Sequence, residues 1–182
     1  MTLTNIDIEN LLQRCLIQDQ AAQLEVYNRY YKAMYNAALR IVKDSAEAED
    51  VMQDSFLIAF TKLDTFKGEA PFGSWLKRIV VNNSINAYKK QVRLGEVPLD
   101  STLYKLTDEP VATPCDTSDL QVQHVMRSMD ELKESYRVAL SLHLIEGYDY
   151  KEVSSILKIS YANCRTTISR AKESLRKKLA AG

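Results

Sequence analysis

Apolar residues recur at intervals of three and four along most of the chain, the spacing that a helix of 3.6 residues per turn places on one face. Glycine and proline are scarce, and long stretches carry neither. No run of alternating β-branched residues is long enough to indicate a sheet. The pattern therefore predicts an all-α protein, with helices at about 6–17, 20–42, 45–62, 73–91, 118–132, 134–146, 150–157 and 161–179.

Two of these helices have specific start signals. Asp44 and Glu47 stand three residues apart before one apolar run, and Asp149 and Glu152 repeat the spacing before another. In such a capping box the aspartate accepts hydrogen bonds from free amides of the first turn, while the glutamate reaches back to the amide of the aspartate. We therefore expect helices to begin near residues 45 and 150.

The segment 94–123 breaks the apolar pattern. It carries three of the four prolines together with scattered Asp, Ser and Thr, a composition that indicates an extended, self-repelling linker. No repeat relates the residues before it to those after it. We therefore expect two different small helical domains, at 1–93 and 124–182, joined by this extended linker.

The formal net charge is zero, which by itself would discourage a nucleic-acid partner. The charges are unevenly distributed, however. The segment 94–123 holds one Lys or Arg against six Asp and Glu, and 124–182 holds 11 against seven, whereas 1–93 is nearly balanced at 12 against 11. The neutral total thus conceals an acidic middle and a basic end.

Several classes of protein are disfavoured. No window approaches the roughly 20 apolar residues of a membrane-spanning helix, and no basic leader precedes an apolar stretch, so we expect a cytoplasmic protein without membrane insertion. Cys15, Cys115 and Cys164 are scattered, and only His124 and His143 could join them, so we expect no disulfide framework, metal or other cofactor. We expect no enzyme either, because no nucleophile, base and orienting group form a set and no phosphate-binding glycine loop is present.

The predicted helix at 45–62 has an acidic side with Asp50, Gln53, Asp54, Leu57 and Thr61, which puts a large apolar residue in the middle of a polar surface. Two readings are open. Single exposed leucines are common, and the pattern alone modestly favours a solvated face. Alternatively, Leu57 fills a partner's groove and the carboxylates set the register. The opposite, apolar side gathers Ala48, Val51, Met52, Phe56, Ala59, Phe60 and Leu63.

The predicted helix at 73–91 carries a polar stripe that includes two asparagines, although asparagine is a poor helix former. Asparagine can donate to and accept from base edges, Lys and Arg neutralise phosphates, and an aromatic ring can stack on a base. The stripe thus has the parts of a nucleic-acid surface, although a lone tryptophan near a helix start is more often a core residue. Its members are Trp75, Arg78, Asn82, Asn86, Lys89 and Arg93, and its core side includes Leu76, Val80 and Ala87.

The connection before this helix, LDTFKGEAPFG, is short and aromatic. Phe66 and Phe72 either plug the end of the domain or contact a partner. The pattern supports the structural role, in which both rings close the end of the domain, at least as well as the contact role.

The stretch DYKEVSSILKISYANCRTTISRAKESLRKKL, residues 149–179, carries the most specific pattern. A short amphipathic helix, a tight turn and a second amphipathic helix predict a helix-turn-helix. The second helix would direct its N-terminal half to base edges and its C-terminal half to phosphates. Six cations against one acid between Arg165 and Lys178 argue against a plain solvated helix. The expected buried positions are Val153, Ile156, Leu157, Ile159, Cys164, Ile168, Ala171 and Leu175, and the expected outward positions are Tyr161, Asn163, Arg165, Thr166, Ser169, Arg170, Lys172, Arg176, Lys177 and Lys178.

These features together resemble the extracytoplasmic-function (ECF) class of bacterial RNA polymerase sigma factors. Three segments carry the resemblance: EAEDVMQDSFLIAF, FKGEAPFGSWLKRIVVNNSINAYKK and LIEGYDYKEVSSILKISYANCRTTISRAKESLRKKL. They occur in the family's order around a variable linker. The resemblance implies an N-terminal sigma region 2 helical bundle and a C-terminal sigma region 4 helix-turn-helix, in a factor that binds core RNA polymerase and directs promoter recognition and transcription initiation.

The resemblance also implies roles for residues. The acidic helix would dock on a coiled coil of the polymerase's largest subunit, which reverses the preference for a solvated face. The implied polymerase-binding residues are Asp50, Gln53, Asp54 and Leu57. The implied minus-ten residues, which capture and hold melted DNA, are Phe66, Lys67, Trp75, Arg78, Asn82, Asn86, Lys89, Lys90 and Arg93. The implied minus-thirty-five residues are Tyr161, Asn163, Arg165, Thr166, Ser169, Arg170 and Lys172.

The implied partners are core RNA polymerase, at the coiled coil and the flap region, promoter DNA and, as is common in the family, an anti-sigma factor. The acidic linker is similar to the segment that the family threads near the RNA exit path.

Three positions depart from the family's pattern. Asn86 replaces a usual aspartate, which removes a charge. Lys158 stands at a turn position usually given to glycine, where a left-handed backbone would cost a non-glycine residue roughly 1 kcal/mol. Arg165 is followed by two threonines where a second cation is common, so the promoter preference does not follow from that of relatives.

Two other functions compete with this one. A polymerase-independent helix-turn-helix regulator would bind specific duplex DNA tightly by itself, whereas a sigma factor would bind weakly without core enzyme. A helical interaction module without DNA function would leave the stripe and the basic helix as solvated faces, and a steep salt dependence of DNA binding would count against it.

Overall fold

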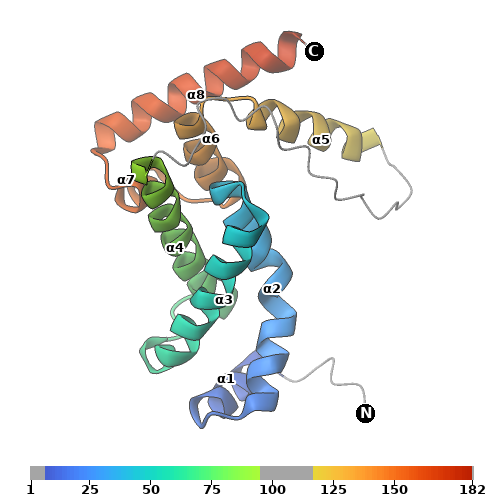
Figure 1. Cartoon of the computed structure of the whole chain (residues 1–182), viewed down its shortest axis with the longest axis vertical. Helices are drawn as coiled ribbons and strands as arrows, with labels where there is room; N and C mark the ends of the chain where they lie inside the picture. Colours follow the sequence, from blue (N-terminus) through green and yellow to red (C-terminus); the bar gives the residue numbers. More distant parts are fainter. Residues whose placement is uncertain (1–6, 95–116, 182) are drawn as a thin grey trace. The chain divides into compact units, whose positions relative to one another are not determined.

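The computed structural model describes residues 7–94 and 117–181, and within these ranges every regular element is a helix (Figure 1). The all-α fold predicted from the spacing of apolar residues is confirmed. The chain divides into two compact units, Met1–Leu94 and Gly95–Gly182.

The first unit, where described, consists of α1 (Ile8–Leu16), α2 (Gln20–Val42), α3 (Ser45–Thr61), the 3₁₀ turn η1 (Leu63–Thr65) and α4 (Phe72–Leu94). The helices α2, α3 and α4 pack against one another, and α1 packs on α2. Their apolar sides meet in a core where side chains from all three long helices exclude water almost completely. The innermost residues include Val26, Ile41, Leu76, Val80 and Ile85, each exposed by 1% or less.

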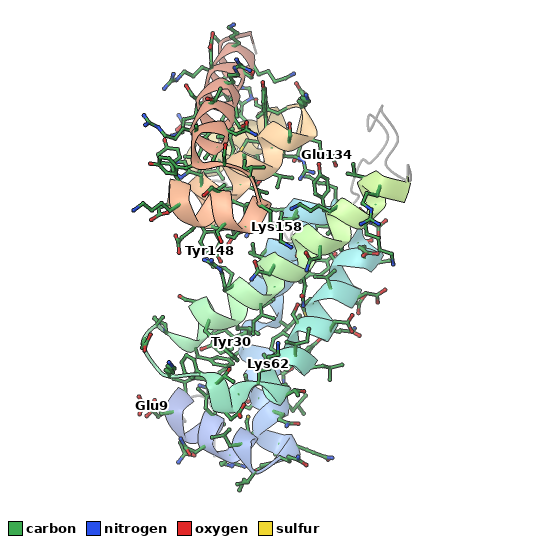
Figure 2. The ribbon with its side chains drawn as sticks, turned by 90° about the vertical axis from the view of Figure 1, so that its left-hand side faces the viewer. Glu9, Tyr30, Lys62, Glu134, Tyr148 and Lys158 are labelled. Atoms are coloured by element: carbon green, nitrogen blue, oxygen red, sulfur yellow. The ribbon has the colours of Figure 1, made fainter. Side chains whose placement is uncertain are left out.

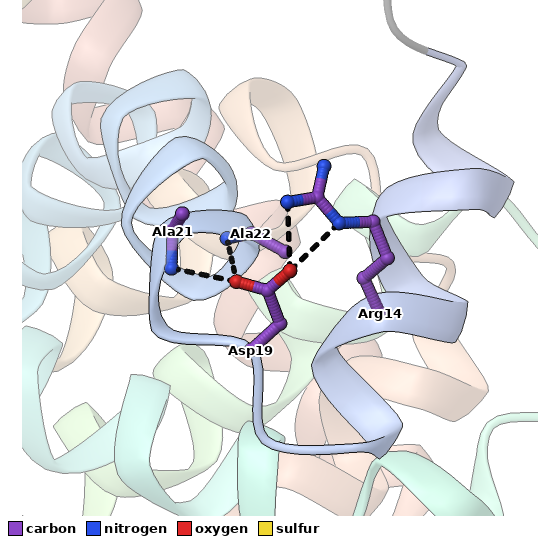
Figure 3. A network of polar contacts seen from close by, with 4 residues as sticks. All are labelled: Arg14, Asp19, Ala21 and Ala22. Carbon is purple, nitrogen blue, oxygen red and sulfur yellow. Dashed lines mark hydrogen bonds and ion pairs between the residues drawn. The ribbon is translucent and has the colours of Figure 1, made fainter.

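A carboxylate joins the first two helices. Asp19 caps α2 because one of its oxygens accepts hydrogen bonds from the amides of Ala21 and Ala22, at 2.9 and 3.3 Å. Its other oxygen lies 2.8 Å from Nε and 2.7 Å from Nη2 of Arg14 at the end of α1 (Figure 3). The hydrogen bond from Arg14, followed by those from the amides, lowers the pKa of the Asp19 carboxyl. The apolar pattern predicts the start of α2 but not this bridge.

The second unit, where described, consists of α5 (Thr117–Asp130), α6 (Glu134–Leu140), the π-helical turn η2 (Ser141–Ile145), α7 (Tyr150–Leu157) and α8 (Tyr161–Ala181). The helices α5, α6 and α7 all pack against α8. Leu140, Val153 and Ile168 are inaccessible to water in the core. Near the C-terminal end of α8, Lys178 forms an ion pair with Glu131, with 3.0 Å between the ammonium and the carboxylate.

One of the two predicted capping boxes is complete. At α7, the Asp149 carboxylate accepts from the Glu152 amide at 2.8 Å, and the Asp149 amide donates to the Glu152 carboxylate at 3.0 Å. At α3, the Asp44 carboxylate accepts from the Glu47 amide at 2.8 Å, which is the forward bond of the pair. Both helices begin where the boxes predict.

The helix predicted at 134–146 changes its geometry before it ends. At Ser141 the α-helical pattern gives way to a π-helical turn, and the Glu146 amide donates to the Ser141 carbonyl at 2.9 Å. Gly147, with φ at +81°, then redirects the chain, and the Tyr148 amide donates to the Leu142 carbonyl at 3.0 Å. Apolar spacing does not distinguish a single π turn from an α turn.

The turn between α7 and α8 is left-handed at Lys158, with φ at +56° and ψ at +47° (Figure 2). Its amide donates to the Ser155 carbonyl at 3.3 Å, and the Ile159 amide donates to the Ser154 carbonyl at 3.1 Å. These two bonds satisfy carbonyls at the end of α7 in the manner of a Schellman motif. The expected penalty for a non-glycine residue therefore applies here.

The segment 94–123, expected to be a linker, lies outside the described residues except at its two ends. The helix α4 continues to Leu94, and α5 begins at Thr117. Residues 117–123 are therefore helical, which confirms the helix predicted at 118–132 and shortens the segment expected to be a linker. Thr117, Ser118 and Asp119 are residue types that favour helix starts, and they precede the apolar positions of α5.

Candidate functional site

The helix α3 presents the acidic side that its sequence predicts. Asp50, Gln53 and Asp54 are exposed, and Leu57 among them is 66% exposed. The Gln53 side-chain amide donates to the carboxylate of Glu49 at 3.1 Å, so the polar surface continues one turn back along the helix. Of the expected apolar side, Phe60 is half-buried and the others are buried: Ala48, Val51, Met52, Phe56, Ala59 and Leu63.

A buried polar contact behind this face ties α3 to α4. Ser55 is inaccessible to water; its hydroxyl donates to the Val51 carbonyl at 2.6 Å and accepts from the Asn83 amide at 3.0 Å. A buried hydroxyl requires such partners because its transfer from water is unfavourable without them. Asn83 therefore has a structural role, which the sequence pattern does not reveal, beside the exposed Asn82.

Four aromatic rings cluster at the start of α4. The buried Phe72 lies 5.4 Å from Tyr30 and 5.7 Å from both Phe66 and Trp75, measured between ring centroids. Phe66 and Trp75 lie 5.3 Å apart. Gly73 permits the close approach, because a Cβ there would stand 2.9 Å from a ring carbon of Tyr30, the ring labelled in Figure 2.

The cluster divides the aromatic residues by role. Phe72 plugs the end of the first unit, as the structural reading of the loop expects. Phe66 and Trp75 are only half-buried, so each keeps part of its surface open to a partner. The tilted and edge-on geometries hold these two rings in place. The lone tryptophan is thus both a packing residue and part of an exposed surface.

The polar stripe follows the accessible side of α4. Lys67 is exposed in the loop before the helix, next to Gly68, whose φ of +72° suits glycine. The helix's opposite side is buried at Leu76 and Val80, whereas Ala87 is half-buried. On the stripe, Asn82, Asn86 and Arg93 are exposed and Arg78 and Lys89 are half-buried; the remaining predicted minus-ten residue, Lys90, is exposed beside it.

The helix α8 presents its N-terminal half to solvent. Its first turn is capped by Ser160, whose hydroxyl accepts from the Asn163 amide at 3.2 Å. The expected buried side of the helix-turn-helix is confirmed at Val153, Ile156, Cys164, Ile168, Ala171 and Leu175, whereas Leu157 and Ile159 are half-buried. The outward residues Tyr161, Asn163, Arg165, Thr166, Ser169 and Arg170 are exposed.

Lys172 differs from the other predicted minus-thirty-five residues because it is half-buried. Its ammonium lies 5.9 Å from the centroid of the Tyr150 ring, within cation–π range. His143 stacks on the same ring, with centroids 4.7 Å apart, and its Nδ1 is 2.9 Å from the Tyr148 carbonyl. The aromatic pair therefore limits where the Lys172 head group can lie.

The described residues offer little other chemistry. Cys15 and Cys164 are free and buried, and burial raises the pKa of both thiols, which disfavours the reactive thiolate. Cys115 lies outside the described residues. Within 7–94 and 117–181, no three His, Cys, Asp or Glu side chains are grouped as metal ligands. No helix in the part of the chain that the structure describes combines the length and apolar character needed to cross a membrane.

Both units match known sequence families. Residues 26–94 match the model of sigma-70 region 2, and residues 123–175 match that of sigma-70, region 4. The acidic face and the stripe fall in the first match, and the helix-turn-helix falls in the second. The two matches, which together cover most of the chain, define a protein of the sigma-70 family.

Relatives refine this class. The chain is 28% identical to the RNA polymerase sigma-H factor of Pseudomonas aeruginosa, with 97% of this chain and 96% of that protein aligned. It is 28% identical to the ECF sigma factor SigM of Bacillus subtilis (84% and 91%) and 29% identical to the ECF sigma-E factor of Escherichia coli (93% and 92%). The chain belongs to the ECF class of RNA polymerase sigma factors, as the resemblance in its sequence predicts.

Solved structures share the fold. CnrH, in complex with the cytosolic domain of CnrY, superposes with a TM-score of 0.55 at 23% identity, covering 96% of this chain and 99% of that one. RpoE from Bartonella quintana, in complex with the anti-sigma factor NepR, superposes with a TM-score of 0.59 at 21% identity, covering 86% and 95%.

Proposed function

We propose that this protein is a sigma factor that binds core RNA polymerase, directs it to promoters and initiates DNA-templated transcription. The observation that carries the proposal is the presence of both sigma regions in one chain, at 26–94 and 123–175. A polymerase-independent regulator would need only the helix-turn-helix and gives no reason for a region 2 unit. On this proposal the protein performs no bond chemistry itself and acts in the cytoplasm, where polymerase and promoter DNA meet.

The acidic face of α3 is the proposed docking site for the coiled coil of the polymerase's largest subunit. Its support is the exposed Leu57 surrounded by Asp50, Gln53 and Asp54. Burial of Leu57 in a groove would supply apolar contact, while the two carboxylates would set the register against basic residues of the partner.

The docking site can be tested with the triple variant Asp50→Ala, Gln53→Ala, Asp54→Ala. We expect it to lose association with core polymerase in gel filtration and to keep its helical circular dichroism, because all three residues are exposed and alanine favours helices. Asp7→Ala with Glu9→Ala is a matched control that also removes two exposed carboxylates from the first unit. If the triple variant associates with core polymerase as the wild type does, these residues are not the docking site.

The stripe on α4 and the loop before it are the proposed minus-ten surface. Phe66 and Trp75 would stack on an unpaired base, and Asn82 and Asn86 would contact base edges. The cations would neutralise phosphates and supply much of the affinity. Strand opening would then use binding energy, because bases held on this surface offset the lost pairing. The proposed cations are Lys67, Arg78, Lys89, Lys90 and Arg93.

The outward side of α8 is the proposed minus-thirty-five surface. In a helix-turn-helix the N-terminal residues of the second helix reach base edges in the major groove. Asn163, Arg165 and Thr166 occupy that part and are exposed. Arg170 and Lys172, further along, would meet the phosphate backbone, with Tyr161 and Ser169 at the margins of the contact.

Two protein contacts complete the proposal. The second unit would contact the flap region of the polymerase, and an anti-sigma factor would restrain the free protein. The support for the second contact is the family resemblance, to which RpoE of Bartonella quintana adds a relative in fold that is held by an anti-sigma factor.

The test of the function is transcription by purified core polymerase from the source organism on fragmented genomic DNA, with and without this protein. We expect new transcript starts that share two upstream elements. The isolated protein should bind the same DNA weakly. Tight specific binding without core enzyme, together with no new starts while a known sigma factor works on the same core, would favour the independent regulator instead.

A further inference from the structure

The outward side of α8 contains a small apolar spot between polar groups. A shallow hollow there is lined by Ala162, Arg165, Thr166, Ser169 and Arg170. Relative to Ala162 these positions are three, four, seven and eight residues further along, so they share one face of the helix. The arginines and the serine bring hydrogen-bond donors, whereas Ala162 brings only a methyl group. The chemistry of the hollow therefore depends on how Thr166 is turned.

Thr166 turns its hydroxyl toward its own helix. Its Oγ1 donates to the carbonyl of Ala162 at 3.0 Å, so the hydroxyl proton is committed and the oxygen can only accept from a partner. Oγ1 and Cγ2 occupy different staggered positions on the same Cβ, so the methyl lies away from the carbonyl that holds the hydroxyl. Thr166 and Ala162, one turn earlier, are both exposed and both line the hollow, so their methyl groups belong to the same face of the helix.

The next residue is also a threonine but has different surroundings. Thr167 is half-buried and does not line the hollow. Its hydroxyl lies 3.4 Å from the side-chain oxygen of Asn163. The two consecutive threonines are thus chemically identical but only Thr166 contributes a methyl group to the face that would enter a groove.

We propose that Ala162 and Thr166 form a thymine-selective contact, which receives the C5-methyl group of a thymine in the upstream promoter element beside the base pair that Arg165 contacts. This inference rests on the proposed function. Thymine is the one base that shows a methyl group in the major groove, and alanine and threonine methyl groups are suitable apolar partners for it. The guanidinium of Arg165 carries donors only, which suit the neighbouring O4 acceptor of thymine and oppose the amino group of cytosine.

The experiment uses core polymerase from the source organism loaded with the full chain. Duplexes with a randomised upstream element are selected for binding by this holoenzyme, and the retained sequences are read. We expect one position to be enriched in thymine. In the best duplex, each thymine is then replaced singly by deoxyuridine, which lacks only the methyl group. We expect the affinity to fall about fourfold at that one position, the effect of one buried methyl group.

Variants assign the methyl effect to a side chain. Thr166→Ser removes the methyl of Thr166 and keeps its hydroxyl and the methyl of Ala162, so this variant should discriminate between thymine and deoxyuridine less than the wild type does. Thr166→Val keeps the methyl and removes the hydroxyl, so it should retain the preference for thymine. Thr167→Ser makes the same chemical change at the adjacent residue, and it should discriminate between thymine and deoxyuridine as the wild type does.

The outcomes separate this inference from the function on which it rests. If an upstream element is enriched but deoxyuridine binds as well as thymine at every position, the contact is wrong and the sigma function stands. The contact is also wrong if Thr166→Ser keeps the wild-type discrimination. If the holoenzyme enriches no upstream sequence at all, the proposed function fails and this inference fails with it.

Discussion

We propose that the helices α4 and α8 both contact DNA, but they present their side chains in different ways. On α8 the proposed base-reading residues, such as Arg165, are exposed on one side, and the opposite side carries the packing. On α4 the proposed DNA residues share in the packing: Trp75 is half-buried and lies 5.3 Å from Phe66 and 5.7 Å from Phe72. Substitutions on the exposed side of α8 should therefore alter DNA binding without altering stability, whereas substitutions at the start of α4 should alter both.

The two proposed tasks explain this difference. Reading an intact duplex requires side chains that protrude far enough to reach base edges in a groove. Holding an unpaired base requires a ring fixed in place, because a mobile ring would lose entropy on stacking. The cluster around Phe72 can fix such a ring, whereas the exposed face of α8 supplies reach.

The largest expected effect comes from removing the ring of Trp75, which both packs in the aromatic cluster and is proposed to stack on a base. Trp75→Ala should destabilise the first unit by up to about 3 kcal/mol, the low end for buried aromatic residues, because Trp75 is only half-buried. Denaturant unfolding followed by circular dichroism measures this loss. The variant should also fail in transcription from duplex promoters and recover partly on a template whose minus-ten element is already unpaired.

Trp75→Phe is the control for this variant, since it keeps an aromatic ring in the cluster. It should preserve most of the stability and part of the activity. Wild-type stability in Trp75→Ala would show that the ring does not support the fold, and the contrast with α8 would fail.

A change on α8 should show the opposite behaviour. Arg165→Ala is expected to change stability by less than about 0.5 kcal/mol, because the residue is exposed. It should relax sequence preference at one position of the upstream element by roughly 1–3 kcal/mol, measured with holoenzyme on single-base variants of a promoter. A uniform loss across all sequences would identify a phosphate contact instead.

Two neighbouring asparagines on α4 sharpen the comparison within one helix. Asn83→Ala should cost about 1 kcal/mol of stability, because it removes the hydrogen bond to the buried Ser55. Asn82→Ala should not destabilise the exposed helix surface, since alanine favours helices, but it should weaken promoter opening. Equal stability of the two variants would mean that the Ser55 contact contributes nothing.

The fold was largely predictable from the sequence because most helices have one clear apolar side. The ranges 20–42 and 150–157 coincide with α2 and α7. The π-helical turn from Ser141 to Ile145 was not predictable, since its apolar spacing resembles that of an α-helix. The bridge between Arg14 and Asp19 was also missed, although an aspartate directly before a helical run was a usable signal.

The candidate surfaces were easier to predict where their side chains take no part in packing. The exposed side of α3, with Leu57 in its middle, follows from placing residues at 100° intervals. The same rule does not tell Asn82 from Asn83, because only the packing of α3 on α4 brings Ser55 to one of them. It also leaves the role of Phe66 open, since a half-buried ring satisfies both readings. Which neighbours a half-buried side chain meets depends on how the helices pack, and the spacing of apolar residues does not contain that information.

The smallest expected effect tests whether the two units are independent in stability. Lys158 has a left-handed backbone at the end of α7, which costs a residue with a Cβ roughly 1 kcal/mol. Glycine removes that strain, but its greater conformational freedom in the unfolded chain lowers the free energy of unfolding by about 0.4–1 kcal/mol. Lys158→Gly should therefore stabilise the second unit by up to about 0.6 kcal/mol.

Lys158→Ala is the matched control, because it removes the same charge but keeps a Cβ in the left-handed turn, and it should bring no gain. The single tryptophan of the chain, Trp75, lies in the first unit, so its fluorescence reports unfolding there, while amide exchange in α7 and α8 reports on the second unit. The gain should be seen by amide exchange only, since the contacts of the first unit are unchanged. An equal gain in the tryptophan transition would show that the two units unfold together, and equal stability of the glycine and alanine variants would show that the turn is not strained.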